Sequence, residues 1–164
     1  MKKIFIPFLG IALAFSLLGT MSFSGGKDLP ASVSTSMNSR YPTAKVKGWE
    51  MKNDQYIVKF VEDKQKCMSY FNADGHWIKT EKLIPLSKDL PTPVRDGLRS
   101  SSYADWHIDR IREVTSRDEQ PMYVLHIDDG DKLDSWHIDA LESNYLIWFS
   151  SDGKLVKKTA YVAR

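Results

Sequence analysis

A pair of short motifs that occurs twice constrains the fold of this chain more than any other feature of its sequence. Lys-Asp-Leu-Pro stands at residues 27–30 and again at 88–91, and each copy is followed by Phe-x-x-Asp-Gly, at 71–75 and at 149–153. The motifs recur in the same order with matching hydrophobic spacing between them, which indicates a tandem duplication. The offset between the copies grows from 61 residues (27 to 88) to 78 residues (71 to 149), so the second copy is the longer one.

Each copy begins with the signals of a short helix. Asp28 and Asp89 are placed to cap the helix, and the proline two residues later suits the first turn, where a missing N–H costs nothing. Apolar residues at helical spacing follow, such as Val33 and Met37 in the first copy. Pro42 is expected to end the first helix, because proline cannot continue it.

After each predicted helix the apolar period changes from 3.6 to 2, which is typical of strands. The Asp-Gly pairs between apolar runs indicate hairpin turns, since glycine supplies the positive φ that such turns need. The predicted fold class is therefore α+β, with two tandem repeats, each a helix packed on an antiparallel sheet of about four strands. The predicted strands are Lys45–Met51, Gln55–Glu62, Lys66–Phe71, His76–Ile84, Trp106–Val114, Met122–Asp128, Tyr145–Phe149 and Lys154–Val162.

The predicted repeats span residues 25–87 and 88–164 and are expected to pack together, with a boundary near Ser87. The second repeat carries an insertion near 131–140, and the sequence leaves open whether it forms an additional strand or an excursion from the sheet. Each repeat alone would be a marginal domain, because small domains bury too little surface. Mutual packing of the repeats follows from this argument.

Residues 1–24 have the pattern of a secretory signal peptide: two lysines, an apolar run and then small residues. The run is shorter than the ~20 apolar residues of a spanning helix, and no cysteine follows to accept a lipid. We therefore expect a periplasmic or secreted protein without stable membrane insertion after signal removal. Removing Lys2 and Lys3 lowers the formal charge from +2 to zero. Since no basic stripe remains, nucleic acid is not an expected partner.

The helix starts, the antiparallel strands and the Phe-x-x-Asp-Gly-x-apolar-apolar-Lys endings at 71–79 and 149–157 together resemble the secreted β-lactamase-inhibitor-like, PepSY-like family of bacterial proteins. The resemblance covers roughly residues 28–162. It implies a tandem α+β module of exported proteins, similar in build to proteinaceous enzyme inhibitors and to propeptide domains that restrain peptidases. The insertion near 131–140 departs from the simple repeat.

Alternation sorts the side chains of each predicted strand onto two faces. The face assigned to the helix-covered core holds Tyr56, Val58, Phe60, Tyr123, Leu125 and Ile127, continued by Cys67, Ser69, Phe71, Ile78, Tyr145, Ile147, Phe149 and Val156. The other face then carries six large side chains that are candidates for protein binding: Met68, Tyr70, Trp77, Leu146, Trp148 and Leu155.

A solvated sheet face is normally polar, so large apolar residues on the second face need an explanation. They could form a binding patch, since tryptophan and tyrosine dominate interface hot spots. Alternatively, the two sheets join into one and bury these side chains against each other or against the insertion. A third alternative is a one-residue slip in register, which would exchange the two faces.

The sequence offers no catalytic constellation. It contains no Gly-rich phosphate loop, no nucleophile elbow and no His-Glu-x-x-His motif, so we expect no enzyme, no catalytic residue and no cofactor. Cys67 is the only cysteine and excludes an internal disulfide. It is expected to be a small buried residue of a strand, since free cysteine is among the most buried residue types.

His-Ile-Asp occurs three times, at 107–109, 126–128 and 137–139, and such pairs on adjacent strands could hold zinc. The motif has no spacing diagnostic of metal, so no metal site is assigned. The preferred function is a non-catalytic exported protein-binding module, inhibitor-like toward an envelope or extracellular enzyme such as a peptidase. The alternative is an exported metal-binding protein that uses these His/Asp pairs.

Overall fold

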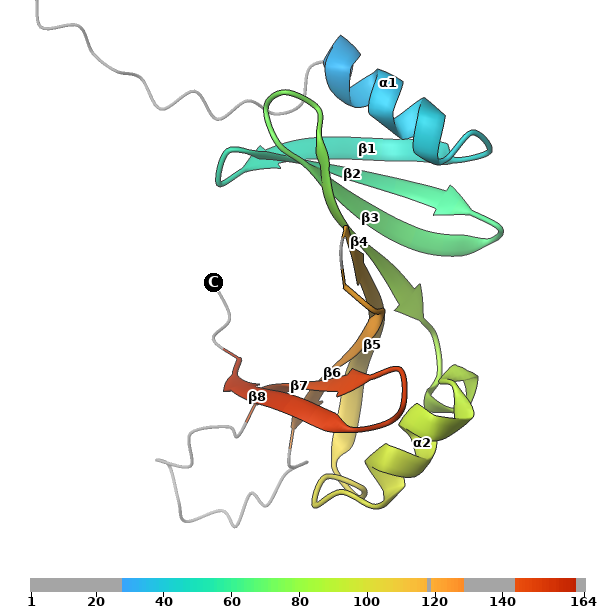
Figure 1. Ribbon diagram of the computed structural model, residues 1–164, viewed down its shortest axis with the longest axis vertical. Coiled ribbons are helices and arrows are strands. Elements are labelled where there is room, and N and C mark those ends of the chain that lie inside the picture. Colours follow the sequence, from blue (N-terminus) through green and yellow to red (C-terminus); the bar gives the residue numbers. More distant parts are fainter. Residues whose placement is uncertain (1–27, 118, 129–143, 162–164) are drawn as a thin grey trace, which may run out of the picture.

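The computed structural model describes residues 28–117, 119–128 and 144–161, which form two α-helices and one antiparallel sheet of eight strands (Figure 1). The predicted signal peptide and the insertion near 131–140 lie outside these residues. The helices are α1 (Ala31–Arg40) and α2 (Thr92–Arg99), and a 3₁₀ turn, η1 (Ser87–Asp89), precedes α2. The strands are β1 (Lys45–Lys52), β2 (Gln55–Glu62), β3 (Gln65–Phe71), β4 (Trp77–Ile84), β5 (His107–Ser116), β6 (Met122–Asp128), β7 (Tyr145–Ser150) and β8 (Leu155–Ala160).

The two repeats share one sheet, because β4 at the end of the first repeat pairs with β5 at the start of the second. The four strands of each repeat are thus halves of a continuous sheet and not a sheet of their own, which corrects the predicted arrangement. Pairing β4 with β5 removes two edges whose backbone groups would otherwise lack partners. Only β1 and β8 remain as edge strands of the described sheet.

Both helices lie on the same face of this sheet. The Tyr41 hydroxyl, just after α1, hydrogen-bonds the Thr80 hydroxyl on β4. Ile84 lies four residues further along β4, on the same face, and belongs to the core beneath α2. In Figure 1 the sheet curls between its two ends, and α1 and α2 lie on its outer side.

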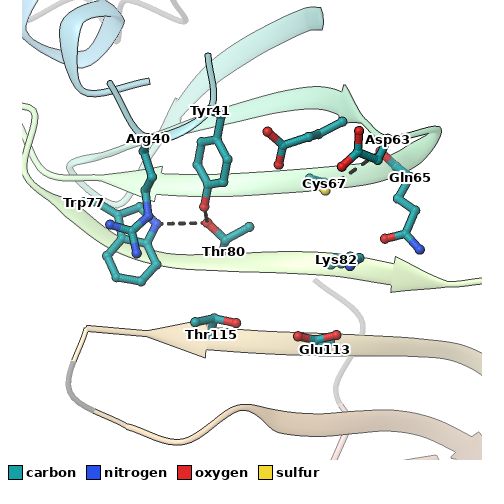
Figure 2. A pocket seen from close by; sticks show the side chains of 11 residues that line it. Arg40, Tyr41, Asp63, Gln65, Cys67, Trp77, Thr80, Lys82, Glu113 and Thr115 are labelled. Carbon is teal, nitrogen blue, oxygen red and sulfur yellow. Dashed lines mark hydrogen bonds between the residues drawn. The ribbon is translucent and has the colours of Figure 1, made fainter. Parts of the chain in front are cut away.

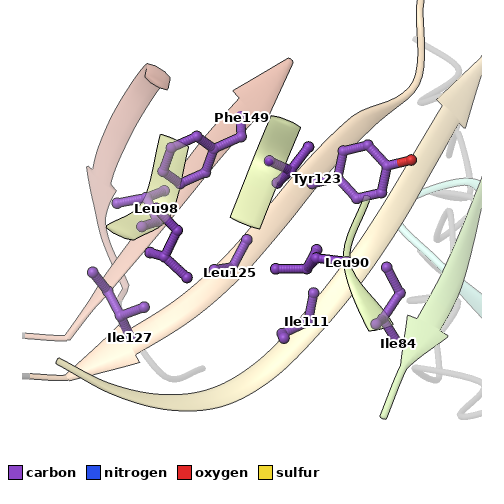
Figure 3. Close-up of a cluster of buried hydrophobic side chains, with 10 residues drawn as sticks. Ile84, Leu90, Leu98, Ile111, Tyr123, Leu125, Ile127 and Phe149 are labelled. Atoms are coloured by element: carbon purple, nitrogen blue, oxygen red, sulfur yellow. The ribbon is translucent and has the colours of Figure 1, made fainter. Parts of the chain in front are cut away.

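Each helix covers its own apolar core. The core beneath α1 contains Val33, Met37, Val58, Phe60, Cys67, Phe71 and Trp77. The core beneath α2 contains Ile84, Leu90, Val94, Leu98, Ile111, Tyr123, Leu125, Ile127, Ile147 and Phe149 (Figure 3). The predicted core positions on β2 and β6 are confirmed: Val58, Phe60, Leu125 and Ile127 are at most 2% exposed. The burial predicted for Cys67 is confirmed as well.

The predicted aspartate caps are wrong. Pro30 and Pro91 occupy the N-cap positions, and neither helix has a side-chain cap hydrogen bond. The carbonyl oxygen of each proline accepts the first helical N–H, from Ser34 at 2.8 Å and from Arg95 at 3.0 Å. Asp28 and Asp89 each stand two residues before the N-cap, too early to cap the free N–H groups of the first turn. The predicted end of the first helix is confirmed, since α1 ends at Arg40, before Pro42.

In both repeats the Asp-Gly turn of the last hairpin touches the helix at backbone level. Gly75 and Gly153 have φ values of +82° and +86°, as the turns require. A Cβ on Gly75 would lie 2.6 Å from the backbone carbon of Ser32 in α1, and a Cβ on Gly153 would overlap the carbonyl oxygen of Pro93 in α2. Gly97 faces the second turn from the helix side, where a Cβ would overlap the carbonyl oxygen of Gly153. The absence of a Cβ at these glycines therefore allows each helix to pack closely against its hairpin turn.

None of the helices among the described residues is long and apolar enough to span a membrane.

Candidate functional site

The candidate site is the face of the sheet opposite the helices, which we call the uncovered face because no helix among the described residues packs on it. Residues paired across neighbouring strands project from the same face, so the strand pairings show which residues belong to the uncovered face. Tyr70 pairs with Ile57 and Lys79, and Trp148 pairs with Val124 and Lys157. The concave side of the curled sheet in Figure 1 is this face.

Four of the six predicted binding residues lie on the uncovered face. Met68 and Tyr70 project from β3, and Leu146 and Trp148 project from β7; all four are half-buried. The two pairs are separated by β4, β5 and β6, so they lie about 19 Å apart along a flat sheet. They form two apolar patches at either side of the face and not one cluster.

Trp77 and Leu155 lie on the helix-covered face, which corrects their predicted placement. A register shift between Tyr70 and Phe71 sets Trp77 opposite Phe71, and the equivalent shift in the last hairpin sets Leu155 opposite Phe149. The irregularity shifts the start of β4 and of β8 by one residue relative to β3 and β7, so Trp77 and Leu155 project from the face opposite to the predicted one. The register slip raised as an alternative from the sequence is therefore what happens in both hairpins.

The environment of Trp77 shows how fully it belongs to the core. Its side chain is 8% exposed, and its Nε1–H donates to Thr80 Oγ1 at 2.9 Å. The Arg40 guanidinium carbon lies 3.4 Å from the centre of the indole ring (Figure 2). Its counterpart Leu155 is 42% exposed. Ile78 and Val156, which the alternation placed in the core, are partly and largely exposed instead, and Val156 is 59% exposed.

A charged cluster lies between the two apolar patches. The Glu81 carboxylate is 5% exposed and accepts hydrogen bonds from Lys79 Nζ at 2.6 Å and from Arg112 Nη1 at 2.7 Å. Burial raises the pKa of Glu81, but the hydrogen bonds and charges of Lys79 and Arg112 outweigh it and leave the pKa below its usual value. Burial and the neighbouring Glu81 raise the pKa of Tyr70 to about 12, so its phenol stays neutral.

This cluster predicts an acid-sensitive component of stability. A carboxylate whose folded pKa is depressed stabilises the fold above its unfolded pKa, here 4.5, and that contribution is lost as the pH falls through the folded pKa. Urea unfolding from about pH 6 to about pH 3 should therefore show a steeper loss of stability in the wild type than in Glu81→Gln. Glu50→Gln is the matched control, because the ion pair of Glu50 with Lys59 is half exposed. Equal slopes for wild type and Glu81→Gln would contradict the prediction.

The middle of the uncovered face is hollowed and basic. A groove of about 510 Å³ crosses β1 to β5, and among the described residues a single carboxylate lines it, that of Glu81, which is paired with Lys79 and Arg112. Met68 and Leu83 form its apolar floor. Its cationic lining residues are Lys47, Lys59, Lys66, Arg110 and Arg112. This local excess of positive charge stands out because the whole chain carries a formal charge of only +2.

A second cavity, of about 360 Å³, lies on the helix side where the two repeats meet (Figure 2). Cys67 borders it, and the Cys67 Sγ lies 3.8 Å from the Gln65 carbonyl oxygen. Burial raises the pKa of the Cys67 thiol, so the thiolate is disfavoured. No histidine among the described residues lines this cavity. The geometry therefore supplies no activated nucleophile at Cys67.

The three His-Ile-Asp motifs have different outcomes. His107 and His126 both contact Asp109, at 3.4 Å and 3.2 Å, so the first two motifs meet on neighbouring strands. The third motif, at 137–139, lies outside the described residues. Sequence alternation alone could not indicate this meeting, because it depends on a register shift between Ile108 and Arg110.

These features define a class of protein: a tandem α+β module with a single curled sheet, of which one face is covered by helices and the other is covered by no described helix. The chain belongs to the β-lactamase-inhibitor-like, PepSY-like family, whose sequence model matches it twice, over residues 25–70 and 69–157. The family resemblance of its motifs is thereby confirmed.

Solved structures share the fold at low sequence identity. A DUF2874 family protein from Bacteroides ovatus superposes with a TM-score of 0.72 at 23% identity, covering 82% of this chain and 89% of that one. A BLIP-like protein from Bacteroides fragilis gives 0.71 at 21% identity, covering 83% and 89%. A protein from Bacteroides eggerthii described as periplasmic gives 0.67 at 19% identity, covering 81% and 89%. No curated protein matches the chain.

Proposed function

We propose that this protein is a non-catalytic, exported binding module that binds a partner protein with the uncovered face of its sheet. The proposed partner is an envelope or extracellular enzyme, such as a peptidase, toward which the module is inhibitor-like. One observation carries the proposal: half-buried aromatic and apolar side chains stand on a sheet face that no described helix covers. Large apolar patches that remain accessible usually mark contact sites. The proposed patch residues are Met68, Tyr70, Leu146 and Trp148.

The chemistry of the face favours an acidic partner. The groove over β1 to β5 is lined by cations, whereas the Glu81 carboxylate, the only one that lines it among the described residues, is already paired with Lys79 and Arg112. Complementary charge across an interface speeds association and suppresses wrong partners. We therefore infer that the partner inserts a carboxylate-bearing segment into the groove and packs apolar side chains against the patches.

Two observations support export. The first 24 residues have the composition of a signal peptide. A structural relative from Bacteroides eggerthii is described as periplasmic. We propose that the mature protein works in the periplasm or outside the cell, where an envelope enzyme would be its partner.

The proposal is tested by affinity capture from the native envelope fraction with immobilised wild-type protein and variants. We expect a captured protein whose affinity falls by about 2 kcal/mol, roughly 30-fold in Kd, in Tyr70→Ala and in Trp148→Ala. Val46→Ala is the matched control, since Val46 is 48% exposed and pairs with Phe60, which belongs to the helix-covered core. Capture that is identical for all three variants would exclude the uncovered face as the binding surface.

Salt and charge reversal test the acidic character of the partner separately. Lys66→Glu, on the rim of the groove, should weaken capture and flatten its salt dependence, because screening acts on exposed charges. Lys88→Glu changes the same charge at an exposed position in η1 and should behave like the wild type. Weakening by Trp148→Ala without any effect of Lys66→Glu would retain the binding face and overturn the acidic partner.

A further inference from the structure

One end of the uncovered face gathers histidine and aspartate side chains from β5 and β6. His107 pairs with Asp128 across the ladder, and Arg110 pairs with His126. The register shift between these pairs makes Asp109 an extra residue of β5, placed between the two histidines. The ligand atoms of His107, Asp109 and Asp128 all lie within 4.8 Å of one another.

We propose that His107, Asp109 and Asp128 form a binding site for a divalent first-row transition metal ion, with zinc as the reference ion. One imidazole nitrogen and two carboxylates are ligands that such ions accept. Ligand atoms around a tetrahedral zinc at ~2.1 Å lie about 3.4 Å apart. His107 Nε2 and Asp109 Oδ1 are 3.4 Å apart without any ion, so this edge of the coordination shell is preformed.

The remaining ligand needs only a small adjustment. No two of the three ligand atoms are farther apart than 4.8 Å, so rotation of surface side chains can draw them in. His107 and Asp109 are 63% and 48% exposed, which leaves the ion a path from solvent. Three protein ligands leave one position of a tetrahedral ion for water or for a group of a partner.

His126 is a positioning residue of this site. Its Nδ1 lies 3.2 Å from Asp109 Oδ2, the oxygen that does not face His107, and its side chain is only 14% exposed. The Tyr161 ring lies 4.1 Å from the imidazole, centre to centre, and packs against it. With a proton on Nδ1, His126 donates a hydrogen bond to Asp109 and fixes the orientation of that carboxylate. Outer groups that hold a ligand in this way typically change metal affinity by 10–100-fold.

Zinc titration of the metal-free mature chain tests the site. We expect one zinc ion per chain by calorimetry and by elemental analysis after dialysis, with a higher melting temperature in the presence of zinc. His107→Asn and Asp109→Asn should each lose stoichiometric binding, whereas His76→Asn should bind like the wild type, because His76 lies in the β3–β4 turn. Melting in the presence of a chelator verifies that each variant is folded.

Cobalt substitution tests the role of His126. His126→Gln should bind Co²⁺ about 10–100-fold more weakly and with an altered visible absorption spectrum, since the geometry of the Asp109 ligand changes. If His126 only stabilises the fold, the spectrum of the cobalt-loaded His126→Gln variant should be unchanged. That result would exclude His126 from the metal site. A wild type that retains no zinc, or a His107→Asn variant that binds as tightly as the wild type, would overturn the metal site itself.

Discussion

Replacing Trp77 with alanine is expected to lower the free energy of unfolding by about 3–5 kcal/mol. The substitution empties a large volume between α1 and the sheet, where the indole is 8% exposed. It also removes the donor to Thr80 Oγ1 and the ring on which the Arg40 guanidinium lies. The Thr80 hydroxyl still bonds Ser69 and Tyr41, so the cavity, and not an orphaned hydrogen bond, should dominate the loss.

Trp148→Ala is the matched control, because it deletes the same side chain from the uncovered face. Trp148 is half-buried and contacts the Lys157 ammonium at 5.0 Å from its ring centre. We expect a loss of only about 1 kcal/mol. Equilibrium urea unfolding of both variants, followed by circular dichroism, measures the difference. Equal losses, or a larger loss for Trp148→Ala, would contradict the assignment of the two tryptophans to opposite faces.

Gly97→Ala is expected to destabilise the protein by about 2–3 kcal/mol, although alanine is the better helix former by about 1 kcal/mol. Gly97 lies in α2, and a Cβ there would overlap the carbonyl oxygen of Gly153. That neighbour is backbone of the β7–β8 turn, so no side-chain rotation can relieve the overlap. The helix would have to move off the sheet, which would loosen the contacts of Val94 and Leu98 with the core.

Gly48→Ala is the control for Gly97→Ala. Gly48 lies in β1, and a Cβ there would meet nothing within 4 Å. We expect a change near zero or a slight stabilisation, because alanine lowers the entropy of the unfolded chain. Thermal and urea unfolding of the pair give the sign directly. A stabilised Gly97→Ala would show that helix propensity outweighs the close approach of α2 to the hairpin.

Most local elements could be predicted from the sequence. The end of α1 before Pro42, the Asp-Gly turns and the buried positions of β2 and β6 depend on neighbouring residues and on an unbroken apolar period. The predicted caps were wrong for a local reason too, because each helix begins two residues after its aspartate, with proline at the N-cap. The family was also predictable, since its motifs are short contiguous stretches.

The candidate sites were only partly predictable. Met68, Tyr70, Leu146 and Trp148 were found because their strands alternate regularly up to that point. Trp77 and Leu155 were misplaced because alternation identifies a face only while the register is unbroken, and each hairpin shifts by one residue just before its phenylalanine. The repetition of the same loop in both copies is the signal that could have indicated a shared irregularity.

Duplication, helix positions, hairpin turns and core pattern were determined by the sequence itself, because each depends on residues close together in the chain. The union of the two halves into one sheet, the pairing of Glu81 with Arg112 and the meeting of His107 with Asp109 and Asp128 were decided by the tertiary structure. The physical reason is that strand pairing and bulges are chosen by contacts between distant segments. Hydrogen bonding of the strand edges and packing of the cores stabilise the fold as a whole. Their result therefore cannot be read from the residue pattern of any one segment.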